Sequence, residues 1–122
     1  MSRGSARGRR ASSMSHVTNL ILTCSVLEED DEDRCPPVDE INRLICKHLG
    51  YDGVLDCFCP VHQAAGGDKA METLVFLAAI GRDWLDDIAE YIAEVDWKSR
   101  DAVQLFVCRQ DEDRYSELAL TL

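Results

Sequence analysis

The chain has 122 residues, 46% of them hydrophobic, with 13 Lys and Arg against 23 Asp and Glu and a formal net charge of −10. This length suits one domain, and the globular composition excludes a chain that is disordered throughout. The acidic balance excludes a general binder of nucleic-acid backbones, because such a surface repels phosphate. No apolar run is long enough to cross a bilayer, which excludes a membrane-spanning protein and favours a cytoplasmic one.

Positive charge is concentrated at the start of the chain. Residues 1–14 are rich in Ser, Gly and Arg, contain four arginines and no acid, and lack the apolar stretch of a secretory signal. Without them, nine bases and 23 acids remain, a net charge of −14. We expect a disordered basic leader at 1–14 and a single α+β domain at 15–122. A transit peptide and an arm that touches nucleic acid are the alternatives for the leader.

The first half of the domain reads as strand, loop and helix. Apolar and β-branched residues alternate over 17–26, which predicts a strand. An acidic loop over 28–34 follows. Pro36 and Pro37 then open a helix with apolar residues at three- and four-residue steps, and Gly50 ends it.

The second half repeats this pattern. A short strand is predicted over 54–59, followed by a loop over 60–72. Residues 73–80 form a nearly unbroken apolar run, typical of a central strand that is covered on both faces. The remaining elements are a helix and two strands, predicted at 83–95, 102–108 and 114–120.

This order of elements predicts a ferredoxin-like βαββαβ sandwich with an additional C-terminal hairpin strand. Both helices then cover one face of an antiparallel sheet. The right-handed crossover rule places the strands at 17–26 and 73–80 in the centre. Because the other face stays uncovered, homodimerisation through that face is a further prediction.

The six cysteines lie at positions 24, 35, 46, 57, 59 and 108, and without a secretory signal we expect reduced thiols. Cys57 and Cys59 alternate within the predicted strand, so both should share a face, and His62 adds a third zinc ligand. Their spacing departs from the Cys-x-x-Cys knuckle, so a zinc-binding domain is an alternative only. A catalytic cysteine paired with His62 or His48 is weaker still, because acidic surroundings raise a thiol pKa.

A third alternative is an enzyme or a small-ligand domain of unidentified chemistry. Its site would be the sheet face or the loop around Gly66-Gly67. That loop lacks the Gly-x4-Gly-Lys-Ser/Thr spacing with which backbone amides wrap a phosphate, and it precedes a strand. The glycines therefore either turn a long hairpin or make a mobile loop that binds a partner.

Carboxylates are the most unusual feature of the chain. The second predicted helix carries acids at helical spacing, with no base from 83 to 96: Asp83, Asp86, Asp87, Glu90 and Glu94. Like charges at i, i+4 each cost roughly 0.2–0.5 kcal/mol, so a helix selected only for stability would include bases. Two further acidic blocks lie at 111–113 and at 28–33, the second of which starts with Glu28, Glu29, Asp30 and Asp31.

These carboxylates are either a solubilising surface or a docking surface. We predict a small non-enzymatic binding protein that needs no cofactor and engages a basic protein through them. An inhibitor, an immunity-type protein or a nucleic-acid-mimicking regulator of a bacterium or phage has these properties. The predicted partner is a basic protein, and for the nucleic-acid-mimicking alternative it is one that itself binds nucleic acid.

Overall fold

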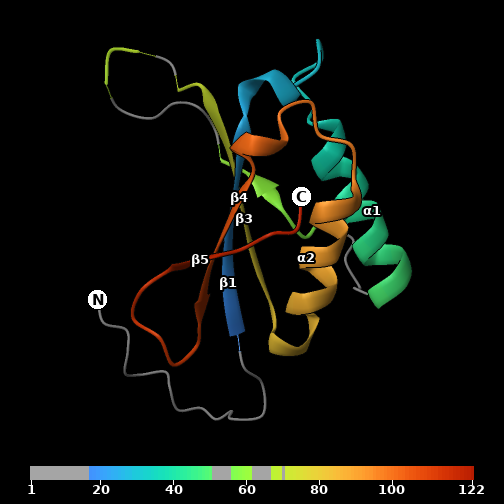
Figure 1. Ribbon diagram of the computed structural model, residues 1–122, viewed down its shortest axis with the longest axis vertical. Coiled ribbons are helices and arrows are strands. Elements are labelled where there is room, and N and C mark those ends of the chain that lie inside the picture. Colours follow the sequence, from blue (N-terminus) through green and yellow to red (C-terminus); the bar gives the residue numbers. More distant parts are fainter. Residues whose placement is uncertain (1–16, 51–55, 62–66, 70) are drawn as a thin grey trace.

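The computed structural model describes residues 17–50, 56–61, 67–69 and 71–122, and in it two helices pack on a five-stranded antiparallel sheet (Figure 1). The predicted α+β class is confirmed. The strands are β1 (Val17–Ser25), β2 (Cys59–Pro60), β3 (Thr73–Gly81), β4 (Gln104–Arg109) and β5 (Ser116–Leu118). The helices are α1 (Pro36–Leu49) and α2 (Leu85–Glu94), with short 3-10 turns η3 (Val26–Glu28), η4 (Arg82–Trp84) and η5 (Arg100–Ala102).

The strand order in the sheet is β2-β3-β1-β4-β5, and every neighbouring pair is antiparallel. β1 and β3 pair along their whole length, from Val17 opposite Gly81 to Ser25 opposite Thr73. Their adjacent position inside the sheet agrees with the crossover rule. The ferredoxin-like arrangement is confirmed only in part, because β2 has two residues and overlaps the strand predicted over 54–59 only at Cys59.

The two helices lie side by side on one face of the sheet (Figure 1). α1 begins at Pro36, and Gly50 ends it in the left-handed conformation with φ 64°, which glycine adopts without a steric penalty. The start and the end of this helix are those that the sequence predicts. α2 is shorter than predicted, because a 3-10 turn precedes it and Val95 already has an extended backbone.

The core lies between the helices and the sheet. The β1 residues Leu20 and Leu22 are at most 1% exposed and belong to the same buried cluster as Ile45 of α1 and Ile88 of α2. Burying one such side chain contributes roughly 1.5–3 kcal/mol, so the alternating pattern of β1 and the apolar sides of the helices together stabilise the sandwich.

β3 is covered on one face only. Leu74, Phe76 and Ile80 are buried, whereas Leu77 between them is 47% exposed. The prediction that the apolar run over 73–80 is covered on both faces is therefore wrong. The helices pack against one side of the sheet, and the side chain of Leu77 lies on the other.

Three predictions fall wholly or partly outside the described residues: the leader at 1–14, the beginning of the strand over 54–59 and much of the loop over 60–72. The six cysteines are all described, and none is joined to another in a disulfide. Within the described part of the chain, the helices are too short or too polar to span a membrane.

Candidate functional site

Helix α2 carries its carboxylates on the side that faces away from the core. Its buried residues are Leu85, Ile88 and Ile92. Its exposed acids are Asp86, Asp87, Glu90 and Glu94, which we call the acidic stripe. At 3.6 residues per turn these four positions span an arc of about 100°, opposite the buried residues. The sequence therefore predicted the composition of this surface correctly.

Asp83 does not belong to the same α-helical surface. It is exposed but lies in η4, before α2 begins at Leu85. The predicted series of acids at i, i+4 and i+7 from Asp83 thus starts outside the helix, because a 3-10 turn advances three residues per turn rather than 3.6. The second predicted series, Asp86, Glu90 and Glu94, lies entirely within α2.

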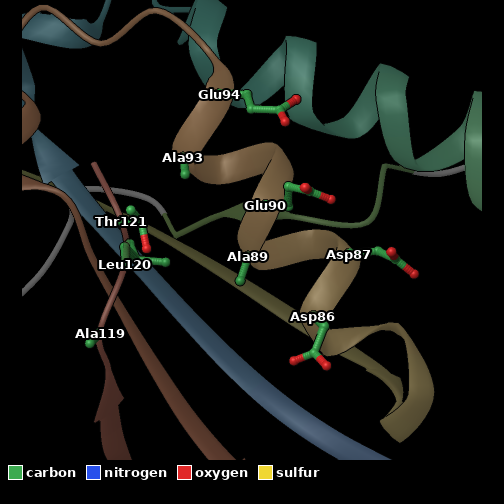
Figure 2. Close-up of a pocket in the computed structure, with 9 residues that line it drawn as sticks. All are labelled: Asp86, Asp87, Ala89, Glu90, Ala93, Glu94, Ala119, Leu120 and Thr121. Carbon is green, nitrogen blue, oxygen red and sulfur yellow. The ribbon is translucent and has the colours of Figure 1, made fainter.

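A groove of about 550 Å³ runs between α2 and the C-terminal segment (Figure 2). Ala89 and Ala93 point from the helix toward Leu120 and Thr121. The four acids of the stripe also line the groove, and there is no basic side chain among the described residues around it. The small alanines leave room for an aliphatic stem, and the carboxylates provide partners for the charged end of a Lys or Arg.

The pKa of Tyr91 is sensitive to the negative charges of the stripe. Burial, followed by the negative charges of Asp87, Glu90 and Glu94, raises the pKa of the Tyr91 phenol above its usual range. Its ring also contacts His48 of α1, with 5.9 Å between the ring centroids. The stripe thus borders the junction between the two helices.

We expect the double variant Glu90→Gln, Glu94→Gln to titrate Tyr91 at a lower pH than the unmodified chain. Neutral amides no longer disfavour the phenolate, so the contribution of these two charges to the raised pKa is lost. NMR spectra of ¹³C-labelled tyrosine, recorded from neutral to alkaline pH, measure the shift. The variant Asp111→Asn, Asp113→Asn makes the same change in net charge and should leave the Tyr91 curve in place. Identical curves for all three proteins would contradict this account of the field.

The C-terminal end of α2 is stabilised by side chains from the segment that follows it. The Trp97 indole donates a hydrogen bond to the Ile92 carbonyl at 2.7 Å. The Arg100 guanidinium donates to the carbonyls of Ala93 and Val95, both at 3.2 Å. These contacts satisfy carbonyls that lack helical partners and bring a positive charge to the negative end of the helix dipole. The helix therefore tolerates acids in its last turn although it contains no base itself.

Glu28 is not part of an exposed acidic loop. It ends η3, is 1% exposed, and its carboxylate accepts hydrogen bonds from the backbone N–H groups of Lys98 at 3.0 Å and Ser99 at 2.8 Å. The prediction that Glu28 contacts a partner is wrong for this structure, because its charge is used inside the protein. It holds the 98–99 segment against η3.

The rest of the acidic block at 28–31 is divided in role. Asp30 Oδ1 accepts hydrogen bonds from the backbone N–H groups of Arg34 and Glu32, both at 2.9 Å. The bond from Arg34 contributes most to lowering the pKa of Asp30 below its usual value. Glu29 is half-buried, whereas Asp31, Glu32 and Asp33 are exposed, with Glu32 paired to Arg34 at 2.8 Å. Part of this block therefore shapes its own turn, and three of the six acids over 28–33 remain exposed, against all four acids of the stripe.

The two cysteines of the predicted zinc cluster do not share an environment. Cys57 lies in a bend before β2 and is 5% exposed, and burial raises its pKa to about 11. Cys59 in β2 is exposed, and its thiol donates to the Asp56 carbonyl at 3.5 Å. Alternation along one strand does not apply, since β2 begins at Cys59. His62 is outside the described residues, among which no group of three acids, cysteines or histidines is placed to hold a metal.

Sequence reasoning missed a second cavity, of about 610 Å³, between α1 and the edge formed by β2 and β3. Its wall includes Cys35, the N-cap residue of α1. A hydrogen bond from the Cys24 thiol, aided by the backbone N–H of Val38, lowers the pKa of Cys35 despite burial. The negative charges of Glu28 and Asp39 act to raise the pKa of Cys35, as expected of acidic neighbours, but these local hydrogen bonds outweigh them. The position of Cys35 directly before the two helix-opening prolines was the available signal.

Carboxylates also line this second cavity. Burial, and then the negative charge of Asp56, raises the pKa of Asp39 above its usual value. The cavity is bordered by Pro60 and Val61, next to His62 in the chain. A small-ligand function at this position remains a prediction.

The structure thus brings together four of the predicted partner-binding residues, the acidic stripe, and places Asp83 before them and Glu28 inside the protein. No protein-family model, curated protein or solved structure shows a significant match to this chain.

Proposed function

We propose that this protein is a non-enzymatic regulator that binds a basic protein through the acidic stripe and the groove beside it. The observation that carries this proposal is a row of exposed carboxylates, uninterrupted by a base, along one side of a helix with a stabilised end. Glu90 in the middle of α2 and Glu94 in its last turn gain nothing from the helix dipole, and like charges four residues apart repel each other. Binding of a partner protein accounts for the presence of these carboxylates.

The chemistry of the stripe suits a protein that normally binds nucleic acid. Asp86, Glu90 and Glu94 recur every four residues, a spacing of about 6 Å along the helix axis. A regular row of negative charges is also what a nucleic-acid backbone presents to its binding proteins. Lys or Arg side chains that contact phosphate are able to contact these carboxylates, with their stems over Ala89 and Ala93. Competition for a nucleic-acid site is then the mode of regulation.

Because the carboxylates are exposed, we expect them to act chiefly on association rate and specificity. The net charge of −14 on residues 15–122 attracts a basic partner over a distance, and the stripe orients it at short range. Both effects weaken as salt screens the charges.

The experiment reverses the charge of three acids of the stripe. The variant Asp86→Lys, Glu90→Lys, Glu94→Lys is mixed with a fluorescently labelled octa-arginine peptide, and association is followed by stopped-flow anisotropy at several salt concentrations. We expect association to be at least about tenfold slower than for the unmodified chain, and its salt dependence to be flatter. Circular dichroism checks that α2 is retained.

The matched control is Asp101→Lys, Asp111→Lys, Asp113→Lys, which reverses three exposed acids that are not part of α2. We expect it to slow association much less, since it changes the net charge equally but spares the stripe. Equal losses in the two variants would show that only total charge matters, and unchanged association in the stripe variant would exclude the stripe as the binding surface.

A further inference from the structure

The face of the sheet opposite the helices has an apolar centre. Residues directly opposite each other in antiparallel strands share a face, so the strand register places Ile21 of β1 in one row with Leu77 of β3 and Phe106 of β4. Leu77 is 47% exposed, and Ile21 and Phe106 are half-buried. Cys59 of β2, which is opposite Leu77, extends the row to the edge of the sheet. We call this side of the sheet the open face.

The open face is free of charge across its three central strands. The positions of β1, β3 and β4 that alternate with the buried ones hold either glycine or apolar residues or uncharged polar residues, which are Asn19, Thr23, Ser25, Thr73 and Gln104. Along the central row, the first charged residue is Glu117 of the edge strand β5, opposite Phe106. In a domain with a net charge of −14, two copies repel each other least where this face meets its equivalent.

We propose that the open face is the interface of a homodimer with two-fold symmetry. β1 and β3 have nine residues each and β4 has six. At about 3.3 Å per residue and 4.8 Å between strands, these three strands offer roughly 400 Å² of flat sheet per copy. Two copies thus bury roughly 800 Å² through these three strands, without counting the edge strands, which is the size of a weak and transient interface.

A contact of this size lies below the standard size of a stable interface, so we expect a weak dimer that forms only at high protein concentration. The symmetry is isologous, because the central strand β1 meets β1 of the second copy. The helices cover the other side of the sheet, so both acidic stripes remain exposed on the outside of the dimer. The dimer is therefore able to engage a partner at two sites, but its existence does not depend on the proposed function.

Salt should have opposite effects on dimerisation and on binding of a basic partner. Dimerisation joins two acidic copies through an uncharged face, so screening should strengthen it, whereas screening should weaken binding of a basic partner to the stripe. Sedimentation velocity of the full chain, from about 1 to 500 µM, should show a shift from monomer to dimer that occurs at lower concentration in high salt.

The variant Leu77→Glu tests the position of the interface. The substitution places a carboxylate at the centre of the open face. In a two-fold dimer this carboxylate lies near the same carboxylate of the second copy, so we expect the dimer to weaken at least about tenfold. Leu77 is half exposed in the monomer, so the fold should persist, as circular dichroism will show. Thr23→Lys on the same face provides a second variant should Leu77→Glu fail to fold.

The matched control is Leu27→Glu, because Leu27 is 65% exposed in η3 and lies outside the sheet. It should leave the dimer unchanged. A chain that stays monomeric at every concentration and salt overturns the proposal, and so does a dimer that survives Leu77→Glu and Thr23→Lys. A third outcome would also overturn the proposal: the full chain is monomeric, whereas a variant without residues 1–14 dimerises. The leader would then be the segment that occupies the open face.

Discussion

Replacing Glu28 with alanine is expected to lower the free energy of unfolding by about 2–4 kcal/mol. The carboxylate accepts two backbone hydrogen bonds, from Lys98 at 3.0 Å and Ser99 at 2.8 Å, and is almost fully enclosed. Alanine removes both acceptors and leaves two N–H groups without a partner, which costs more than the lost bonds alone. It also leaves a cavity where the side chain was.

Urea denaturation, followed by tryptophan fluorescence, measures the effect on Glu28→Ala as a lower transition midpoint at an unchanged slope. Glu28→Gln keeps the shape of the side chain but replaces one acceptor oxygen with an NH₂ donor that faces a backbone N–H group. We therefore expect the Glu28→Gln variant to be less stable than the unmodified protein as well. Glu94→Ala is the matched control: Glu94 is exposed, and its removal should change stability by no more than about 0.5 kcal/mol. A Glu28→Ala midpoint equal to that of the control would refute the structural role of Glu28.

Replacing Asn42 with alanine is expected to cost about 2–3 kcal/mol. Asn42 of α1 is 4% exposed, its Nδ2 donates to the Phe58 carbonyl at 3.1 Å, and its Oδ1 accepts from the Phe58 N–H at 2.9 Å. These two bonds attach the segment before β2 to α1, and Phe58 itself is 1% exposed. Without them, two buried backbone groups of Phe58 lose their partners.

Hydrogen exchange distinguishes this local effect of Asn42→Ala from general instability. The Phe58 N–H should lose protection in the variant to a greater degree than the amides at the centre of β1. Arg43→Ala is the control on the neighbouring helix position, where the exposed ion pair with Glu40 contributes no more than about 0.5 kcal/mol. Uniform loss of protection, or none, would contradict the attachment of this segment by Asn42.

The large losses of stability expected for Glu28→Ala and Asn42→Ala have a common cause: both side chains make hydrogen bonds to distant segments, which the sequence does not reveal. Glu28 and its hydrogen-bond partners are 70 and 71 residues apart in the chain, and Asn42 is 16 residues from Phe58. Glu28 stands first in a run of six acids, which by composition alone indicates a solvated loop. Only the approach of the 98–99 segment turns this one acid inward, while Asp31 stays exposed.

Local patterns were sufficient for the fold class and for most of the elements. Alternation over 17–26 predicts β1, the prolines and Gly50 bound α1, and apolar steps of three and four residues predict both helices. The same periodicity predicts the acidic stripe, because a helix with one buried side must expose the other. These features follow from hydrophobic period and backbone preference, which short stretches of sequence contain.

Contacts between distant segments were decided by the tertiary structure alone. The apolar run over 73–80 does not reveal that helices cover only one face of β3, so the exposure of Leu77 and the open face were not apparent from its pattern. Likewise, α2 contains no base in its last turn, and Arg100 reaches back to its carbonyls only after the chain has folded. The sequence by itself thus determined which elements form and where acid accumulates. Packing determined which acids remain available and which face of the sheet the helices leave uncovered, because both depend on partners that lie far apart in the chain.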